Sequence, residues 1–255
     1  MSYIVDYPLL FFIVSFVLLW VSARIGASFL GRQRRLQESH REDFSVILTA
    51  TLTLLGLIVG FSFSMAISRY DQRKNLEEEE ANAIGTQYLR AGLLPAADGA
   101  KVRALLKDYL AQRISFYTVR DLEHHPEINV RTAQLQSELW STIQAPATAQ
   151  PTPVAAVVVT GMNDVLNSQG YTQAAWWNRI PAAAWGLMAA IAVCCNLLVG
   201  YGTRDVESER LLLLILPLVV SISFMLIADI DSPRGGLIRV HPQNLTSLSD
   251  SLRTQ

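Results

Sequence analysis

The sequence contains little charge and few of the residues that build disulfides or metal sites. Charged residues make up 17% of the 255 positions, against about 25% in soluble domains. The net charge of −1 gives the chain no general attraction for nucleic acid. The two cysteines, Cys194 and Cys195, are neighbours inside an apolar run, where we interpret them as packing residues. A disulfide framework and a nucleic-acid partner are therefore not expected.

Catalytic motifs are also missing from the sequence. There is no glycine-rich phosphate loop, no serine elbow and no paired zinc-ligand motif. One segment gathers side chains that can bind a metal, namely Asp121, Glu123, His124, His125 and Glu127. Adjacent histidines point in different directions on a helix and a proline interrupts this segment, so a solvated helix end is the favoured interpretation. We expect no catalytic residue, no cofactor and no metal, and an enzyme is the least favoured class.

Four long apolar runs are the most informative feature that is present. They cover residues 8–30, 44–67, 180–201 and 211–230, and each has the roughly 20 apolar residues that a helix needs to cross a bilayer. The runs do not alternate between polar and apolar residues as barrel strands do. The sequence therefore predicts an all-α membrane protein with four transmembrane helices and a helical domain inserted between the second and third spans.

This arrangement divides the chain into four parts. Residues 1–67 form the first transmembrane hairpin, and residues 68–179 form a helical extramembrane domain that continues from the second span. Residues 180–230 form the second hairpin, and residues 231–255 are a C-terminal tail. Within the extramembrane domain we expect the second span to continue as a helix to Leu94, followed by helices over residues 102–117, 128–143 and 154–168. Residues 145–154 are expected to be a loop, and Trp176 and Trp177 fit an interfacial belt.

A stripe of small residues follows one face of the second span. Thr49, Thr53, Gly56, Gly60 and Ser64 recur at intervals of three or four residues. The glycine pair has the GxxxG spacing that lets another helix approach closely, which is the packing interpretation. The alternative is that the stripe lines a conduction pathway at the axis of an oligomer. In that case its aromatic neighbours Phe61 and Phe63 are candidates for a constriction, and the sequence leaves both interpretations open.

Four consecutive acids, Glu77, Glu78, Glu79 and Glu80, follow the second span on the same predicted helix. A solvated helix face that pairs with nearby basic residues is the simpler interpretation. In a symmetric oligomer the same residues would form acidic rings at a pore mouth, a feature that favours cations.

Charged residues of both signs follow the second and fourth spans on the same side of the membrane. Charges at this depth are costly unless they are paired, so we favour a structural ion-pair network over an ion-binding vestibule. Pro233, Gly235 and Gly236 are expected to turn the tail back against the middle domain. The charged residues of the predicted network are Arg69, Asp71, Asp229, Asp231, Arg234 and Arg239.

The arginines near the span ends bear on orientation. Arg32, Arg34, Arg35 and Arg41 lie in the short link between the first two spans. Cytoplasmic loops are enriched in such residues, which favours a cytoplasmic link and an extracytoplasmic middle domain.

Three segments resemble a family of bacterial membrane proteins of unknown function described as bestrophin-like. They are LLGLIVGFSFSMAISRYDQRKNLEEEEANAIGTQYLRAGLLP, RIPAAAW and LIADIDSPRGGLIRVHPQNL. The resemblance implies four spans with the helical domain between the second and third, as in bestrophin anion channels, which are pentamers whose second span lines a narrow hydrophobic neck. It also implies a cytoplasmic domain and cytoplasmic termini, contrary to the arginine count. Bestrophins have an acidic cluster after the fourth span, the calcium clasp, and only Asp229 and Asp231 resemble it in this sequence. We therefore do not predict calcium gating.

The resemblance and the residues together predict a homo-oligomeric protein of the bacterial inner membrane. Its expected partners are membrane lipid, further copies of itself and inorganic ions, which it would conduct through an axis lined by the second span. The alternative function is a non-conducting membrane scaffold or sensor whose helical domain binds a partner.

Overall fold

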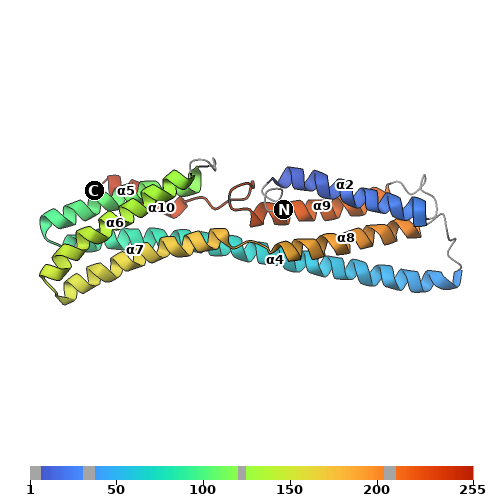
Figure 1. Cartoon of the computed structure of the whole chain (residues 1–255), viewed down its shortest axis with the longest axis horizontal. Coiled ribbons are helices and arrows are strands. Elements are labelled where there is room, and N and C mark those ends of the chain that lie inside the picture. Colours follow the sequence, from blue (N-terminus) through green and yellow to red (C-terminus); the bar gives the residue numbers. More distant parts are fainter. Residues whose placement is uncertain (1–6, 31–37, 120–124, 204–210, 255) are drawn as a thin grey trace. The chain divides into compact units, whose positions relative to one another are not determined.

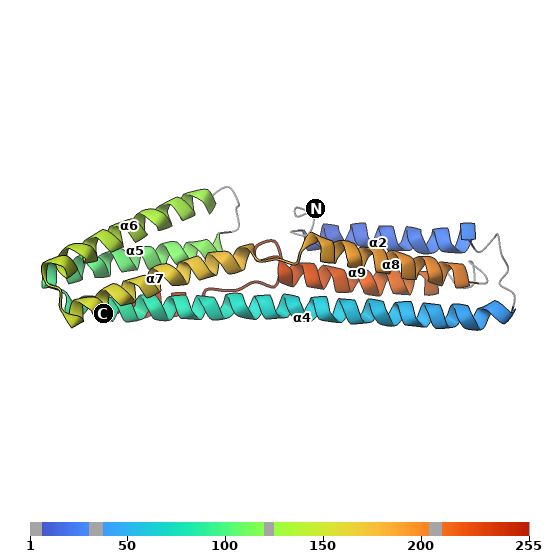
Figure 2. The ribbon, with the colours of Figure 1, turned by 60° about the horizontal axis from the view of Figure 1, so that its bottom comes forward.

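The structure is a computed structural model that describes residues 7–30, 38–119, 125–203 and 211–254. Its regular elements are helices, and they form two compact units. Unit 1 contains Met1–Tyr70 and Arg179–Arg239, and unit 2 contains Asp71–Asn178 and Val240–Gln255. One long helix, α4 (Glu38–Arg90), contributes residues to both units and is the long ribbon labelled in Figure 2.

Unit 1 contains the apolar helices. These are α2 (Pro8–Ile25), which ends in a π-helical turn η1 (Gly26–Leu30), the first part of α4, α8 (Ala182–Gly202) and α9 (Leu212–Asp231). In the described residues four helical stretches are long and apolar enough to cross a membrane, as the sequence predicts. Helix α2 packs against both α8 and α9, and the three lie side by side in Figure 1.

Two glycines allow α2 and α8 to approach closely. A Cβ atom placed on Gly200 would lie 2.0 Å from the Ala23 carbonyl oxygen, and one placed on Gly26 would lie 2.2 Å from the Leu197 carbonyl oxygen. Real side chains do not fit at such distances, so the two backbones touch because both positions lack a side chain. Within the described residues, the backbones of α2 and α8 therefore meet at Gly26 and Gly200, whereas a Cβ on Gly56 or Gly60 has no atom within 4 Å.

The core of unit 1 is built around Trp185 of α8. Its ring makes edge contacts with Phe11 of α2 at a centroid distance of 5.1 Å and with Phe224 of α9 at 6.2 Å. Leu55 and Ala66 of α4 complete this core from the fourth helix. Edge-to-face aromatic pairs add about 0.5–1.5 kcal/mol beyond the area they bury, so the three-helix contact has a specific geometry.

Unit 2 is a helical bundle on the second part of α4. It comprises a 3₁₀ turn η2 (Ala91–Leu93), α5 (Ala96–Thr118), α6 (His125–Ala149), α7 (Pro153–Trp177) and α10 (Gln243–Arg253). Phe116 and Tyr117 of α5 pack against Trp176 of α7, with centroid distances of 4.8 and 5.4 Å. Helix α6 contributes Leu135, Leu139 and Ile143, all buried.

The expected helices of this unit are present, but two expectations change. The predicted loop over residues 145–154 is wrong for its first half, because α6 continues through Pro146 to Ala149. The neighbouring alanines have high helix propensity, and the helix continues although Pro146 lacks the N–H that would bond to the preceding turn. Of the two tryptophans, Trp176 is 5% exposed and belongs to the core, whereas Trp177 is 74% exposed, and its place in an interfacial belt stays a prediction.

The C-terminal tail is divided between the units. Residues 232–239 belong to unit 1, and residues 240–254 belong to unit 2, where α10 packs against α5. Lys107 Nζ of α5 donates a hydrogen bond of 2.7 Å to the Leu252 carbonyl, and Leu245 and Leu252 are buried. The two buried leucines lie seven residues apart, which places them on one face of α10.

Candidate functional site

The small-residue face of α4 is exposed in unit 1. Thr49, Thr53, Gly56, Gly60 and Ser64 are all exposed, and a Cβ placed on either glycine meets no described atom within 4 Å. Only 6% of the most apolar stretch of α4 is buried, against 50% for α9. The described part of the chain therefore leaves this face uncovered. Its glycine and hydroxyl residues have small side chains, which offer little apolar surface to lipid.

The two aromatic candidates beside this stripe have different surroundings. Phe61 is 62% exposed, whereas Phe63 is partly buried against the core of unit 1. Phe63 therefore contributes to packing within the protomer, and a constriction at either aromatic residue stays a prediction.

An ion pair between helices lies within the predicted charge cluster at the membrane edge. Arg69 Nη1 of α4 donates a hydrogen bond of 3.2 Å to Asp231 Oδ1 at the end of α9. The same carboxylate accepts hydrogen bonds of 3.2 and 3.1 Å from the Ile180 backbone N–H, just before α8 begins. Asp231 is 1% exposed, and it therefore connects three chain segments within a buried site.

Asp229 instead holds a loop. Its Oδ1 and Oδ2 accept hydrogen bonds of 2.7 and 2.9 Å from the backbone N–H groups of Leu237 and Ile238. A Cβ on Gly236 would lie 2.4 Å from the Asp229 carbonyl oxygen, so this turn requires glycine there. The PRGG segment thus folds back onto α9, and its anchor is a carboxylate bound to backbone rather than to a cation.

The remaining charges of the predicted cluster are Arg239, Arg234 and Asp71. Arg239 donates from Nε to the Gly236 carbonyl, Arg234 is half-buried, and Asp71 is exposed and belongs to unit 2. The oxygens of Asp229 and Asp231 already accept hydrogen bonds from protein donors. In the described residues no group of three or more His, Cys, Asp or Glu side chains is arranged to hold a metal ion.

The segment considered for metal binding is described only in part. Asp121, Glu123 and His124 lie outside the described residues. His125 is buried, with Nε2 at 3.1 Å from the Val119 carbonyl oxygen, and Glu127 is exposed.

The four acids on α4 separate into two pairs in unit 2. Glu77 and Glu80 are 1% and 0% exposed, whereas Glu78 and Glu79 are exposed. Residues three apart share a helix face, so Glu77 and Glu80 both face the bundle. Their expected place at a pore mouth is corrected by this burial, and only Glu78 and Glu79 remain available to solvent.

Glu80 is the acceptor of a buried network. Arg113 of α5 donates to it from Nε and from Nη2, the latter at 3.3 Å. The hydroxyls of Tyr117 and Thr172 lie at 3.4 and 3.3 Å from Glu80 Oε2. The carboxylate therefore joins three helices, α4, α5 and α7.

The electrostatics of this network keep its tyrosines protonated. Burial, together with the neighbouring Glu80 charge, raises the pKa of Tyr117 and of Tyr109 well above the ordinary range. Burial alone would lower the pKa of Arg113, but the Glu80 charge, the hydrogen bond to Glu80 and the neighbouring tyrosines together outweigh burial and raise that pKa. Tyr117 thus remains a hydrogen-bond donor and Arg113 remains a cation at any physiological pH.

Glu77 anchors the C-terminal helix. Its two carboxylate oxygens accept a hydrogen bond of 2.7 Å from Asn244 Nδ2 and one of 2.9 Å from the Leu245 backbone N–H. This N–H belongs to the first turn of α10, where it lacks a partner inside the helix. Glu77 therefore acts as an N-terminal cap supplied by another helix.

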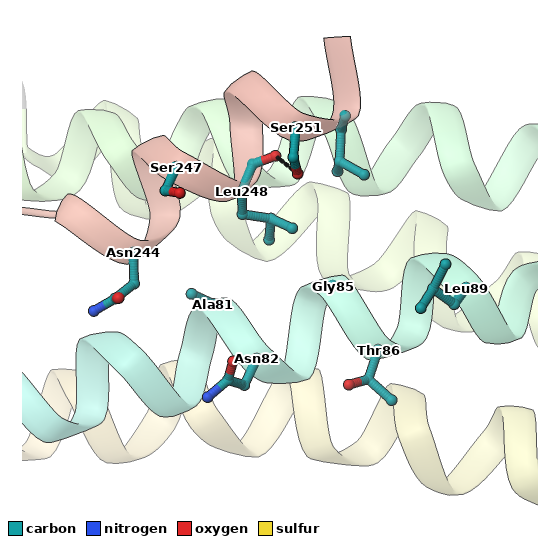
Figure 3. Close-up of a pocket in the computed structure, with 10 residues that line it drawn as sticks. Ala81, Asn82, Gly85, Thr86, Leu89, Asn244, Ser247, Leu248 and Ser251 are labelled. Atoms are coloured by element: carbon teal, nitrogen blue, oxygen red, sulfur yellow. Dashed lines mark hydrogen bonds between the residues drawn. The ribbon is translucent and has the colours of Figure 1, made fainter. Parts of the chain in front are cut away.

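A groove of about 470 Å³ lies between α4 and α10. Figure 3 shows Asn82 and Thr86 on α4 and Asn244, Ser247 and Ser251 on α10 around it. The polar groups in the groove are hydroxyls and amides, which can bind a neutral partner but offer no charge for a metal.

Sequence reasoning missed Arg113 and the glycines that bring α2 and α8 together. Arg113 stands at a buried position of the helical period, between Tyr109 and Phe116, and an arginine at such a position is a signal for a buried acid. Gly26 and Gly200 carry no such signal, because they are 174 positions apart in the sequence and form no local motif.

The comparisons with known proteins agree with the fold. A family model described as the bestrophin-like domain matches residues 9–245, and no curated protein matches the chain. Similar solved structures include a bacterial bestrophin homologue from Klebsiella pneumoniae, with 14% identity, a TM-score of 0.62 and coverage of 96% of this chain and 95% of that one. A single-residue variant of the same homologue has 13% identity and a TM-score of 0.64, with coverage of 96% and 97%.

Proposed function

Because the chain belongs to the bestrophin-like family, a family of membrane proteins, we propose that it is a homo-oligomeric ion channel of the bacterial inner membrane, with α4 lining the axis. The proposal includes no catalytic step and no cofactor. The observation that carries it is the uncovered face of α4, which has small and hydroxyl residues where a lipid-facing helix usually has large apolar ones.

The chemistry of this face suits contact with water and with further copies of the helix. Thr53 Oγ1 donates to the Thr49 carbonyl at 2.8 Å, so its proton is satisfied within the helix and its oxygen presents lone pairs outward. Gly56 and Gly60 leave space for neighbouring helices. Phe61 stands beside them as the proposed constriction, since it is the more exposed of the two aromatic candidates.

The same helical face continues beyond the span. Asp71 and Glu78 follow Ser64 at intervals of seven residues, close to two helical turns. Both acids are exposed, and in a symmetric oligomer each becomes a ring of like charges around the axis. Such rings favour cations, so we propose that Asp71, Glu78 and the adjacent Glu79 shape the potential at one mouth.

Recordings from planar bilayers test the proposal. The purified wild type is expected to conduct, and a Glu78→Gln/Glu79→Gln variant is expected to shift its reversal potential toward anion preference in asymmetric salt. The shift should shrink at high salt, because the Debye length falls from about 10 Å at 0.1 M to about 3 Å at 1 M. The matched control is Glu138→Gln, which removes an exposed acid from α6.

Two outcomes would count against parts of this proposal. A folded oligomer that passes no current at either voltage sign, with several salts, would exclude the channel. Current with the same selectivity in wild type, variant and control would keep the channel and remove Glu78 and Glu79 from its mouth.

The alternative is a non-conducting scaffold or sensor. The groove between α4 and α10 favours it, because hydroxyl and amide groups beside Leu89 and Leu248 form a mixed surface suited to a protein or peptide partner. The absence of current from the folded oligomer would favour this function.

A further inference from the structure

Unit 1 contains a cavity of its own, in addition to the groove of unit 2, and this cavity is separate from the uncovered face of α4. It has a volume of about 540 Å³ and lies between the first turn of α2, the last turns of α9 and the loop that Asp229 holds. Most of its lining is apolar, including Leu9 and Leu10 from α2, Met225 and Leu226 from α9, and Leu237 from the loop. The volume falls within the range of about 300–1,000 Å³ for sites that bind small molecules.

Asp229 is the charged residue in the described lining of the cavity. Its carboxylate is hydrogen-bonded within the fold. Both of its carboxylate oxygens accept hydrogen bonds from the backbone N–H groups of Leu237 and Ile238. The hydrogen bonds that fold the loop over the cavity therefore also satisfy the carboxylate, so the cavity can accept an apolar occupant without leaving that acid unpaired.

The cavity lies at the end of two apolar spans. Helix α2 begins at Pro8 and α9 ends at Asp231, so its walls stand where the apolar part of each span meets the polar region. Leu237 is 88% exposed and Leu9 is 72% exposed. Exposed apolar side chains grouped around a concavity are characteristic of a binding surface, and lipid is the apolar medium at this depth.

Basic residues flank the loop segment that lines the cavity. Arg234 precedes Gly235, and Arg239 follows Ile238 and is held by its Nε hydrogen bond to the Gly236 carbonyl. Arginine has a planar set of donors that matches phosphate oxygens. Gly235 and Ile238 line the cavity, so each arginine is the direct sequence neighbour of a residue that an acyl chain in the cavity would contact.

We propose that this cavity binds one acyl chain of a membrane phospholipid with an anionic head group, and that Arg239 contacts the phosphate. The site is independent of ion conduction, because it uses neither α4 nor unit 2. The bound lipid covers Leu237 and completes the packing between the start of α2 and the end of α9.

Retention of lipid through purification tests the site. The full chain is reconstituted in vesicles of equal amounts of phosphatidylcholine and phosphatidylglycerol, extracted in detergent and analysed by native mass spectrometry. The wild type is expected to retain one phosphatidylglycerol per subunit. Leu226→Trp, which fills the cavity from α9, should reduce this retention several-fold, as should Leu9→Trp from the opposite wall.

The matched control is Leu218→Trp, at a residue of α9 that is 41% exposed and does not line the cavity. It should retain lipid like the wild type. Arg239→Gln should keep a lipid but lose the preference for phosphatidylglycerol over phosphatidylcholine. Helical content by circular dichroism identifies any variant that fails to fold, and if Leu226→Trp fails then Leu9→Trp decides.

The proposal is overturned by any of three results. These are a wild type that retains no lipid, equal losses in Leu218→Trp and the cavity-filling variants, and wild-type retention in both folded cavity-filling variants.

Discussion

The two parts of α4 are buried to very different extents. In unit 1 the buried residues among its described side chains are Leu55, Ser62 and Ala66, about one for every three turns. In unit 2 the buried residues recur almost every turn and include Glu77, Glu80 and Ile84. One helix thus has a part that its own chain covers and a part that its own chain leaves exposed. The difference indicates that unit 2 packs as a self-contained bundle, whereas unit 1 leaves α4 available to other partners.

Within unit 1 the same contrast separates α4 from the other helices. Backbones touch at Gly26 and Gly200, where α2 meets α8. Helix α4 is held mainly through side chains, such as the Arg69 pair with Asp231 and the edge contact of Phe44 with Tyr201. The contact of α2 with α8 should therefore be sensitive to a single methyl group, while the exposed face of α4 should tolerate one.

The largest expected effect comes from the covered part of α4. Arg113→Met leaves the Glu80 carboxylate buried without its cation, and removal of one partner from a buried ion pair costs about 3–5 kcal/mol. We expect the free energy of unfolding of unit 2 to fall by about that amount. Urea titration of the full chain in detergent, followed by limited proteolysis of unit 2, measures it.

An exposed ion pair of the same unit supplies the control. Arg131 and Glu138 are 3.8 Å apart and about half exposed, so Arg131→Met should cost at most about 1 kcal/mol. Equal costs for the two methionine variants would show that burial does not set the strength of the Glu80 pair.

The next effect concerns the contact between α2 and α8. Gly200→Ala places a methyl group 2.0 Å from the Ala23 carbonyl oxygen, so the helices must separate. Overpacking of this kind typically costs about 1–3 kcal/mol. Gly186→Ala, on the same helix with no described atom within 4 Å of its Cβ, should be neutral or slightly stabilising. Thermal unfolding of both variants decides, and a Gly200→Ala protein as stable as the wild type would contradict the close packing.

A smaller effect on the protomer is expected at the exposed face of α4. A Cβ atom on Gly60 meets no described atom within 4 Å, so we expect Gly60→Leu to leave helical content and protomer stability unchanged. If copies of α4 meet at this face, the leucine holds them apart and the mass of the detergent-solubilised oligomer falls. Gly186→Leu is the matched control and should keep the wild-type mass. A monomeric wild type, or an unchanged mass in Gly60→Leu, would remove the oligomer interface from this face.

The last prediction concerns the side of the membrane on which unit 2 lies, and its variants are expected to change neither stability nor assembly. Single cysteines at Ser39 and at the exposed Ser137 of α6, in a background without Cys194 and Cys195, are labelled in intact cells by an impermeant reagent. The arginine count predicts labelling at position 137 and not at position 39. The reverse pattern would place unit 2 in the cytoplasm, as the family resemblance implies. Arg32, Arg34 and Arg35 lie outside the described residues, and Arg41 lies outside the described side chains.

Local patterns predicted the helices, and long-range contacts account for what the sequence could not predict. The four spans and the continuation of α4 follow from composition and from the lack of a helix breaker up to Leu94. The run from Glu77 to Glu80 could not be divided into buried and exposed pairs, because the donor Arg113 lies 33 residues from Glu80. For the cluster at the membrane edge, the sequence predicted that charged residues of opposite sign would pair. It could not predict that Asp229 and Asp231 would accept hydrogen bonds from backbone N–H groups, because every residue except proline has such a group.

The position of Asp231 also has a mechanical consequence. Through Arg69 and the Ile180 N–H, the carboxylate at the end of α9 fastens the middle of α4 to the start of α8. Nearer the start of α4, this helix meets the end of α8 through the rings of Phe44 and Tyr201. Charged hydrogen bonds resist separation, whereas ring contacts can slide. When a thinner or thicker bilayer forces the spans to tilt, we therefore expect α4 to pivot about its contact with Asp231, with the larger displacement at the Phe44 contact.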